Sequence, residues 1–313
     1  MTSPFLPEGR LLHTPENQAA CASPEGLRQA MKTGAILEGI ALSCDARHDL
    51  TVSLGPFTGR IPREEAALGI AEGETRDIAI LSRVGKPVCF TVEGLEGQDG
   101  RLVPLLSRRR AQQMALEHML AHWRPGQIIP AVVTHLEPFG AFVDIGCGVV
   151  SLIGIENISV ARIPHPQARF SVGDAIYAVV QDLDLTHRRI YLTHKELLGT
   201  WQENADRFHA GETVVGLVRS VESYGVFIEL APNLAGLAER CDGLRPGQPV
   251  SVFIKSILPE KMKIKLVIVN RELAGPLFFA PRYFITGGRL EHWVYSTPGS
   301  KKRIETDFGP AAL

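Results

Sequence analysis

The sequence predicts an all-β protein built from three small closed barrels that follow one another along the chain. Short apolar runs with the two-residue period of a strand recur over most of the 313 residues, separated by glycines, prolines and charged side chains. An eight-residue pattern also occurs twice at a fixed distance, which indicates duplicated domains. The strand spacing therefore predicts the fold class, and the repeat predicts how the barrels are arranged along the chain.

The repeated pattern is PFGAFVDI at residues 138–145, which returns 85 residues later as SYGVFIEL at residues 223–230. The same offset continues without a gap through the next predicted strand. Further along, Gly173 aligns with Gly247 at an offset of 74, so the later copy lacks 11 residues between its third and fourth strands. Two consecutive copies of one domain follow from this alignment.

These copies are the second and third barrels. Five predicted strands lie within residues 123–194, at 126–133, 138–145, 150–155, 176–180 and 189–193. Five strands with a longer connection after the third are typical of an OB-type barrel. Residues 195–210 are expected to form a helical linker, and the third barrel repeats the plan over residues 211–269.

The repeated strand places aromatic residues on the face that points away from the core. With a two-residue period, Ala141 and Val143 point into the barrel, whereas Phe142 and Asp144 point outward. Glu229 takes the place of Asp144 in the later copy and is expected to point outward as well. We therefore predict an exposed aromatic surface on each barrel, formed by Phe139 and Phe142 in the second and by Tyr224 and Phe227 in the third. Single-stranded nucleic acid binds to such surfaces because every base can stack on a ring.

The last strand of the third barrel is basic. Lys261, Lys263 and Lys265 alternate with apolar residues, so the three ammonium groups are expected on one face. Lysines on an outer face often serve solubility alone. Beside the aromatic surface, contact with phosphate is an equally open interpretation.

The first barrel, residues 34–107, is a degenerate copy. Its strands are expected at 36–42, 50–54, 78–81 and 88–92. His48 and Thr51 stand where the second barrel has Phe139 and Phe142, so we expect a docking module rather than a base-stacking one. Residues 59–65 form either its contact loop or a simple solvated loop.

Helices are predicted at the start of the chain and between the first two barrels. Residues 1–33 contain a short helix that Ser23 caps, that Pro24 begins and that runs to about residue 31. Residues 108–122 are rich in helix formers and predict a helical linker. The arginines at 108–110 either contact phosphate or are solvated on this helix.

The tail, residues 270–313, predicts a β-hairpin. Residues 283–286 and 290–295 read as two strands around the turn Gly287-Gly288, and a further strand could follow residues 301–303. A small sheet packed on the third barrel and an independent RNA-contacting element are both open.

Composition narrows the class of protein. A net charge of −1 argues against non-specific wrapping of duplex nucleic acid. The five cysteines are scattered and odd in number, which favours reduced thiols over disulfides or a zinc site. We see no paired carboxylates, phosphate-cradling glycine loop or nucleophile with a base, so we expect no enzyme, no catalytic residue, no metal and no cofactor. With neither a visible secretory signal nor an apolar run of about 20 residues, we expect a cytoplasmic protein without membrane contact.

Four motifs resemble the S1 RNA-binding domain family in a tandem form like that of bacterial ribosomal protein S1-like proteins. They are G-x4-A-x-V from Gly126, PFGAFVDI, FSVGD and DLTHRRIYLT. The resemblance implies OB barrels that bind single-stranded RNA through two aromatics, a histidine, an aspartate and an arginine. The matching residues are Phe139, Phe142, Asp184 and Arg189 in the second barrel, and Tyr224, Phe227 and Lys263, in place of the arginine, in the third. Gly154 and Glu239 stand at the histidine position.

The resemblance implies a ribosome-associated protein that holds or presents mRNA during translation, with single-stranded RNA and the small ribosomal subunit as partners. An alternative is a ribosome-docked scaffold or a silencing factor of the hibernation type, with mainly protein contacts. A structural role is also open for two of the matched residues, since Asp184 and Arg189 could form an ion pair that closes a turn.

Overall fold

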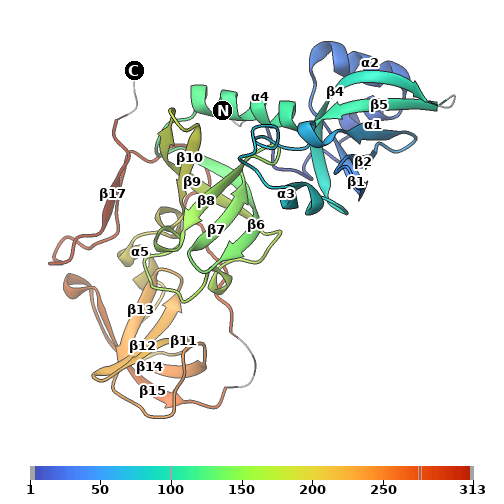
Figure 1. Ribbon diagram of the computed structural model, residues 1–313. Coiled ribbons are helices and arrows are strands. Elements are labelled where there is room, and N and C mark those ends of the chain that lie inside the picture. Colours follow the sequence, from blue (N-terminus) through green and yellow to red (C-terminus); the bar gives the residue numbers. More distant parts are fainter. Residues whose placement is uncertain (1–3, 99–100, 274, 276, 311–313) are drawn as a thin grey trace. The chain divides into compact units, whose positions relative to one another are not determined.

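The computed structural model describes residues 4–98, 101–273, 275 and 277–310 (Figure 1). The chain divides into two compact units. Unit 1 comprises Met1–Trp123 and Asp144–Val150, and unit 2 comprises Arg124–Val143 and Ser151–Leu313. None of the helices in the described part of the chain combines the length and the apolar character that a membrane span needs.

Unit 1 contains the first barrel, which closes with the strand order β1-β2-β3-β5-β4. Its strands are β1 (Leu37–Cys44), β2 (Leu50–Ser53), β3 (Thr58–Ile61), β4 (Pro87–Gln98) and β5 (Arg101–Ser107). Leu50, Val52 and Ile61 alternate with more exposed residues and fill the interior. The predicted five-stranded barrel is therefore confirmed.

Two predictions within this barrel are wrong. Residues 78–81 form the single helical turn α3 (Ile78–Leu81) rather than a strand. A four-residue apolar run fits a strand and a helical turn equally well, and here only Ile80 is fully buried while Ile78 is exposed. The third strand is instead β3, which with the short 3-10 helix η1 (Arg63–Glu65) occupies most of the segment expected to be a loop.

Three further helices belong to unit 1. The helix α1 (Pro15–Cys21) is capped by Thr14, and α2 (Pro24–Thr33) is capped by Ser23 as predicted and ends at Gly34 in the left-handed conformation. The helix α4 (Arg108–His122) follows β5 directly, and the hydroxyl of Ser107 accepts a hydrogen bond from the backbone N–H of Arg110. The helix α1 was not predicted.

Unit 2 contains the second and third barrels, which close with the same strand order as the first. The second consists of β6 (Ile128–Glu137), β7 (Gly140–Asp144), β8 (Val150–Gly154), β9 (Ala175–Asp184) and β10 (Arg189–Thr193). The last residue of β7 and the first residue of β8 fall in unit 1. The third consists of β11 (Thr213–Glu222), β12 (Gly225–Ala231), β13 (Leu234–Ala238), β14 (Pro249–Leu258) and β15 (Lys263–Asn270). In every barrel the third and fifth strands pair in parallel, so one topology is built three times.

Short helices lie in the connections of unit 2. The expected helical linker consists of η4 (Lys195–Leu198) and α5 (Trp201–Ala205), whose start is fixed by a capping box of Thr200 and Glu203. The 3-10 helices η2 (Ile155–Asn157) and η3 (Pro166–Ala168) lie between β8 and β9, and η5 (Pro259–Lys261) lies between β14 and β15.

The tail forms a two-stranded sheet with a different pairing from the predicted one. The strand β16 (His292–Val294) pairs with β17 (Glu305–Asp307), and no strand forms at 283–286. The predicted turn at Gly287-Gly288 fails because this segment bonds to the second barrel: Ile128 N–H donates to the carbonyl of Gly288, and Leu290 N–H donates to that of Gly126. The tail packs on both barrels of unit 2, with Trp293 and Tyr295 in one apolar cluster and Tyr283, Leu290 and Phe308 in the other.

Candidate nucleic-acid interface

Two phenylalanines form an aromatic pair on the outer face of the second barrel. Phe139 lies in the turn before β7 and is 56% exposed, and Phe142 is the one residue of β7 that is not fully buried. Their ring centroids are 6.0 Å apart and the rings are perpendicular, at 89°. Gly140 lies between them against the carbonyl oxygen of Ile153, where a side chain would clash. The tight turn therefore holds both rings on the surface.

The third barrel repeats this arrangement. Tyr224 is 67% exposed, Phe227 is half-buried on β12, and the ring centroids are 6.1 Å apart at 88°. Gly225 again lies against a carbonyl oxygen, that of Ala238. The same turn thus produces the same pair of perpendicular rings in both barrels.

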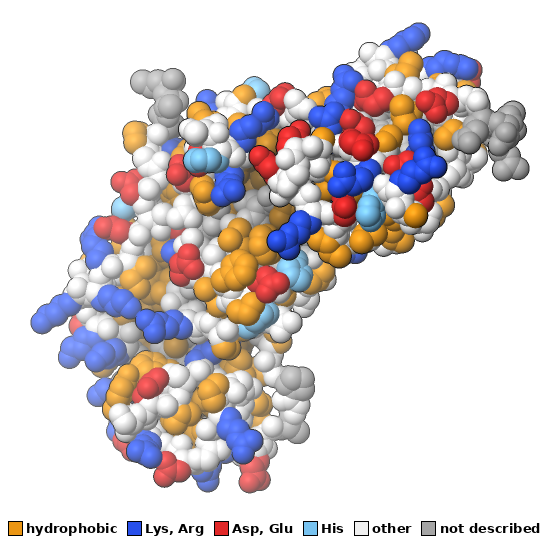
Figure 2. Space-filling view, viewed as in Figure 1, with side chains coloured by type: hydrophobic (Ala, Val, Ile, Leu, Met, Phe, Trp, Pro, Cys, Tyr) orange, Lys and Arg blue, Asp and Glu red, His pale blue; other side chains and the backbone are white. Residues whose placement is uncertain are grey.

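Two further rings were missed by sequence reasoning, one beside the first pair and one on β10, two strands away from β7. His135 on β6 lies 6.2 Å from Phe142 at an interplanar angle of 29°, and its Nε2 lies 2.7 Å from a carboxylate oxygen of Glu137. Tyr191 on β10 is 41% exposed and lies in register with Leu152 of β8. Tyr191 alternates with the buried Ile190 and Leu192, so the two-residue period along β10 could have found it. The same period places His135 on the inward face with the buried Ala131 and Val133, so its exposure could not have been found in this way. Figure 2 shows hydrophobic side chains gathered over the region of β6 and β7, with histidines next to them.

Asp184 and Arg189 face each other at the ends of β9 and β10, but they do not form the ion pair considered above. Asp184 accepts hydrogen bonds from the backbone N–H groups of Thr186 and His187, at 3.0 and 2.9 Å, and pairs with the His187 ring at 2.7 Å. These hydrogen bonds lower the pKa of Asp184. Within the described residues no ion pair joins Asp184 to Arg189, which is exposed. Asp184 therefore closes the turn with His187 and not with Arg189.

Two lysines of the third barrel lie on the same outer face as its aromatic pair. Lys263 and Lys265 are both exposed on the outer face of β15. Lys265 is in register with Leu237, which is in register with Phe227, so ring and ammonium group belong to one row across three strands. Lys261 was expected on the same strand, but it ends η5, and Met262 in the left-handed conformation reverses the chain after it.

Comparison with known proteins identifies the second barrel. Residues 123–195 match the family model described as the S1 RNA binding domain. The second barrel is an S1 domain. The resemblance expected from its motifs is thereby confirmed for these residues. This match leaves out the first barrel, the third barrel and the tail.

Relatives of greater length were found as well. The chain is 30% identical over 200 residues to the small ribosomal subunit protein bS1 of Staphylococcus epidermidis and to that of Staphylococcus aureus strain COL, which covers 59% of this chain and 50% of each relative. The chain thus spans about half the length of these relatives. A crystal structure of a multidomain protein with nucleic acid binding domains from Streptococcus pneumoniae is 16% identical, covers 76% of this chain and 74% of that one, and has a TM-score of 0.24.

The two acids expected to point outward beside the rings are buried. Asp144, at the end of β7, accepts hydrogen bonds from the backbone N–H groups of Glu8, Gly146 and Gly148, at 2.8, 2.8 and 3.0 Å. Burial, together with the nearby Glu8 carboxylate, raises the pKa of Asp144 to about 7. The prediction is wrong because the N-terminal segment covers this end of the strand, where Cys147 N–H donates to the carbonyl of Leu6.

Glu229, the equivalent acid of the third barrel, is fully buried between two arginines. It pairs with Arg169, from the connection between β8 and β9, and with Arg219 of β11, whose Nε lies 2.7 Å from the carboxylate. Burial raises the pKa of Glu229, and the two guanidinium groups act against that shift. Arg169 also donates to the carbonyl of Pro232 at 3.1 Å. This buried charge cluster joins the S1 domain to the third barrel, and neither acid is part of the exposed aromatic surface.

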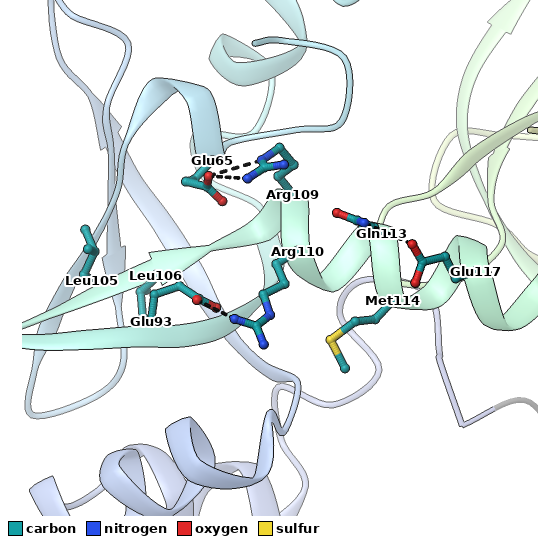
Figure 3. A pocket seen from close by; sticks show the side chains of 9 residues that line it. All are labelled: Glu65, Glu93, Leu105, Leu106, Arg109, Arg110, Gln113, Met114 and Glu117. Atoms are coloured by element: carbon teal, nitrogen blue, oxygen red, sulfur yellow. Dashed lines mark hydrogen bonds and ion pairs between the residues drawn. The ribbon is translucent and has the colours of Figure 1, made fainter. Parts of the chain in front are cut away.

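Each arginine of the run in α4 has a carboxylate partner, and the three side chains differ in exposure. Arg108 is buried and its Nε lies 2.6 Å from a carboxylate oxygen of Glu8. Arg109 pairs with Glu65 at 2.6 Å and Arg110 with Glu93 at 2.7 Å. Figure 3 shows the last two pairs at the edge of a pocket of about 510 Å³. The solvated interpretation is wrong for Arg108, which is buried against Glu8, whereas Arg110 is exposed as that interpretation expects. Phosphate contact by the run stays a prediction.

Side chains of the types that bind metal ions stand apart from one another in the described residues. No group of three or more histidine, cysteine, aspartate or glutamate side chains among them could hold a metal ion. The buried carboxylates Glu8 and Glu229 are engaged by arginines, and Asp144 is engaged by backbone N–H groups.

Proposed function

We propose that this protein binds single-stranded RNA on the outer faces of the S1 domain and the third barrel. The observation that carries this proposal is the pair of perpendicular exposed rings, repeated with almost the same geometry in both barrels. Rings stack on bases for about 1–3 kcal/mol per base and with little sequence preference. The contacting residues would be Phe139, Phe142, Asp184 and Arg189 in the S1 domain and Tyr224, Phe227 and Lys263 in the third barrel.

We further propose that the protein acts in the cytoplasm on the small ribosomal subunit and holds mRNA there during translation. The relatives in the two staphylococci are small ribosomal subunit proteins, which supports this setting. A net charge of −1 gives little long-range attraction to RNA. Two weak sites on one strand compensate for this, since linking sites can raise affinity by roughly 10²–10⁴-fold.

The test is the double variant Phe142→Ala with Phe227→Ala. Fluorescence anisotropy with an unstructured oligoribonucleotide long enough to reach both barrels should show a loss of about 5- to 150-fold for each single variant, the equivalent of 1–3 kcal/mol. The double variant should lose more, because avidity is lost as well. Phe278→Ala is the control, since Phe278 is an exposed phenylalanine outside the barrels. If a folded double variant binds as the unmodified protein does, the proposal is wrong.

A second candidate function is protein docking through unit 1. This barrel has His48 and Thr51 at the positions of the aromatic pair, and His48 lies 3.6 Å from Asp77 instead of presenting a free ring. Cosedimentation of the double variant with small ribosomal subunits separates the two candidates. If the double variant still associates with the subunit but no longer binds the oligoribonucleotide, docking is assigned to other surfaces of the chain. If it loses both, RNA stacking is the main contact with the subunit.

A further inference from the structure

We infer that the S1 domain contains a base-reading subsite, a hollow beside His135 that receives one nucleobase of the bound strand. The inference rests on the proposed function, because the base belongs to the same RNA that stacks on Phe139 and Phe142. The hollow has a volume of about 450 Å³, which is within the range of small-ligand sites. It is lined by His135 and Leu136 of β6 and by Gln167, Phe170, Ser171 and Val172 of the connection between β8 and β9.

His135 connects the hollow to the aromatic pair. Its ring is nearly parallel to that of Phe142, at 6.2 Å and 29°, and Phe142 in turn meets Phe139 edge to face. The side chain of His135 is also one wall of the hollow. An RNA strand whose bases stack on the two phenylalanines would therefore reach the ring of His135 next. The hollow lies directly beyond that ring.

The walls of the hollow combine apolar and polar groups in the way that a base requires. Leu136 and the 61%-exposed Val172 offer apolar contacts to the face of a base. Gln167 and Ser171 are exposed, and among the described residues neither the Gln167 side-chain amide nor the Ser171 hydroxyl has a hydrogen-bond partner. An amide presents a donor and an acceptor side by side, so it can bond two atoms of one base edge. Splayed bases of single-stranded RNA are read in this manner.

The third barrel lacks this subsite although it has the same aromatic pair. Ser220 stands at the position of His135, opposite Phe227 in the register of β11 and β12. The later copy is also 11 residues shorter between its third and fourth strands, where the S1 domain has Gln167. The two barrels should therefore differ in sequence preference: the S1 domain selects among bases, and the third barrel does not.

The experiment measures the dissociation constants of the full chain for the dodecamers rU12, rC12 and rA12. The unmodified protein should distinguish its preferred oligomer from the others. Gln167→Ala should weaken binding of the preferred oligomer by about 5- to 150-fold, the range for one bidentate contact with a base edge, and should bring the three constants close together. His135→Ala should weaken the preferred oligomer most. Ser220→Ala is the matched control in the third barrel and should leave all three constants unchanged.

Phe142→Ala separates this inference from the proposed function. It should weaken all three oligomers by a similar factor and preserve their ratio, because stacking is tolerant of sequence. The subsite is refuted if the unmodified protein does not discriminate among the oligomers, or if Gln167→Ala keeps their ratio while Phe142→Ala weakens them all. If Phe142→Ala has no effect on any oligomer, the proposed function itself fails. Gln167 is exposed on a connection, so its variant should fold, and circular dichroism checks this.

Discussion

The S1 domain and the third barrel present the same aromatic pair in different surroundings. The rings are 6.0 and 6.1 Å apart at 89° and 88°, so the turns that hold them are equivalent. On the fifth strand, however, the S1 domain has Arg189 and Tyr191 where the third barrel has Lys263 and Lys265. The common part of the repeat is the pair of perpendicular rings, and the variable part is the set of side chains on the neighbouring fifth strand.

This difference predicts that the two barrels contact different parts of one RNA strand. Additional rings such as Tyr191 add stacking, which depends little on salt. Ammonium groups such as those of Lys263 and Lys265 neutralise phosphates, and this contribution falls as salt rises. We therefore expect the S1 domain to hold bases and the third barrel to hold the backbone.

The buried acids of the two barrels also differ in the groups that contact them. Asp144 and Glu229 occupy equivalent positions of the repeat, and both are covered by a segment from elsewhere in the chain. Asp144 is held by three backbone N–H groups, whereas Glu229 is held by two guanidinium groups. One acid therefore fixes a backbone segment, and the other balances buried positive charge.

The largest expected effect is on stability, in the variant Glu229→Gln. The change leaves Arg169 and Arg219 without their buried counter-charge, and breaking a buried ion pair by removing one partner costs about 3–5 kcal/mol. Urea unfolding should show the loss through the fluorescence of Trp201 and Trp293, which both lie in the apolar cluster of the third barrel. A loss below about 1 kcal/mol would mean that the cluster does not hold the two barrels together.

Asp144→Asn is the matched variant in unit 1, and it should differ in its dependence on pH. The folded pKa of Asp144, about 7, lies above the ordinary value of 3.8, so its protonated form stabilises the fold. That contribution is complete below pH 3.8 and is lost as pH rises towards 7, by about 1.4 kcal/mol per pH unit. Hydrogen exchange of unit 1 peptides at pH 5 and 7 should show the stability of the unmodified protein falling relative to the variant. A difference independent of pH would contradict this account.

Much of this arrangement could be predicted from the sequence, and the failures at Asp144 and Arg108 have one physical cause. A two-residue period indicates which face of a strand a side chain lies on. For this reason the barrels and the outward orientation of Phe142 and Phe227 could be predicted. The period does not state what covers that face. Asp144 is buried by residues more than 100 positions earlier in the chain, and the partner of Arg108 is also 100 positions away. No local pattern contains such contacts.

An intermediate effect is expected on RNA affinity, from strand β10 compared with β15. Tyr191→Ala should weaken binding by about 1–3 kcal/mol with an unchanged salt dependence, because it removes one stacking ring. The double variant Lys263→Ala with Lys265→Ala should instead reduce the slope of log K against log salt by about 1.4, since each phosphate contact to a single strand contributes about 0.7. Titrations between 50 and 200 mM salt, roughly the range over which such slopes are measured, give both quantities.

Lys261→Ala is the control for the double lysine variant, because Lys261 is also exposed but lies outside β15. It should change the slope less than Lys263→Ala or Lys265→Ala does. Equal slopes for the Tyr191 variant and the double lysine variant would contradict the division between a base-holding and a backbone-holding barrel.

The smallest expected effect comes from moving one ring between the barrels. Ser220 is opposite Phe227 in the register of β11 and β12 and is half-buried, so a histidine there would lie beside Phe227 as His135 lies beside Phe142. Pairs of rings contribute about 0.5–1.5 kcal/mol beyond their buried area. Ser220→His should therefore tighten binding of an unstructured oligoribonucleotide by about 2- to 10-fold. The added ring should not create a base preference, because the third barrel still lacks the connection that contains Gln167; a new preference would show that His135 alone reads the base.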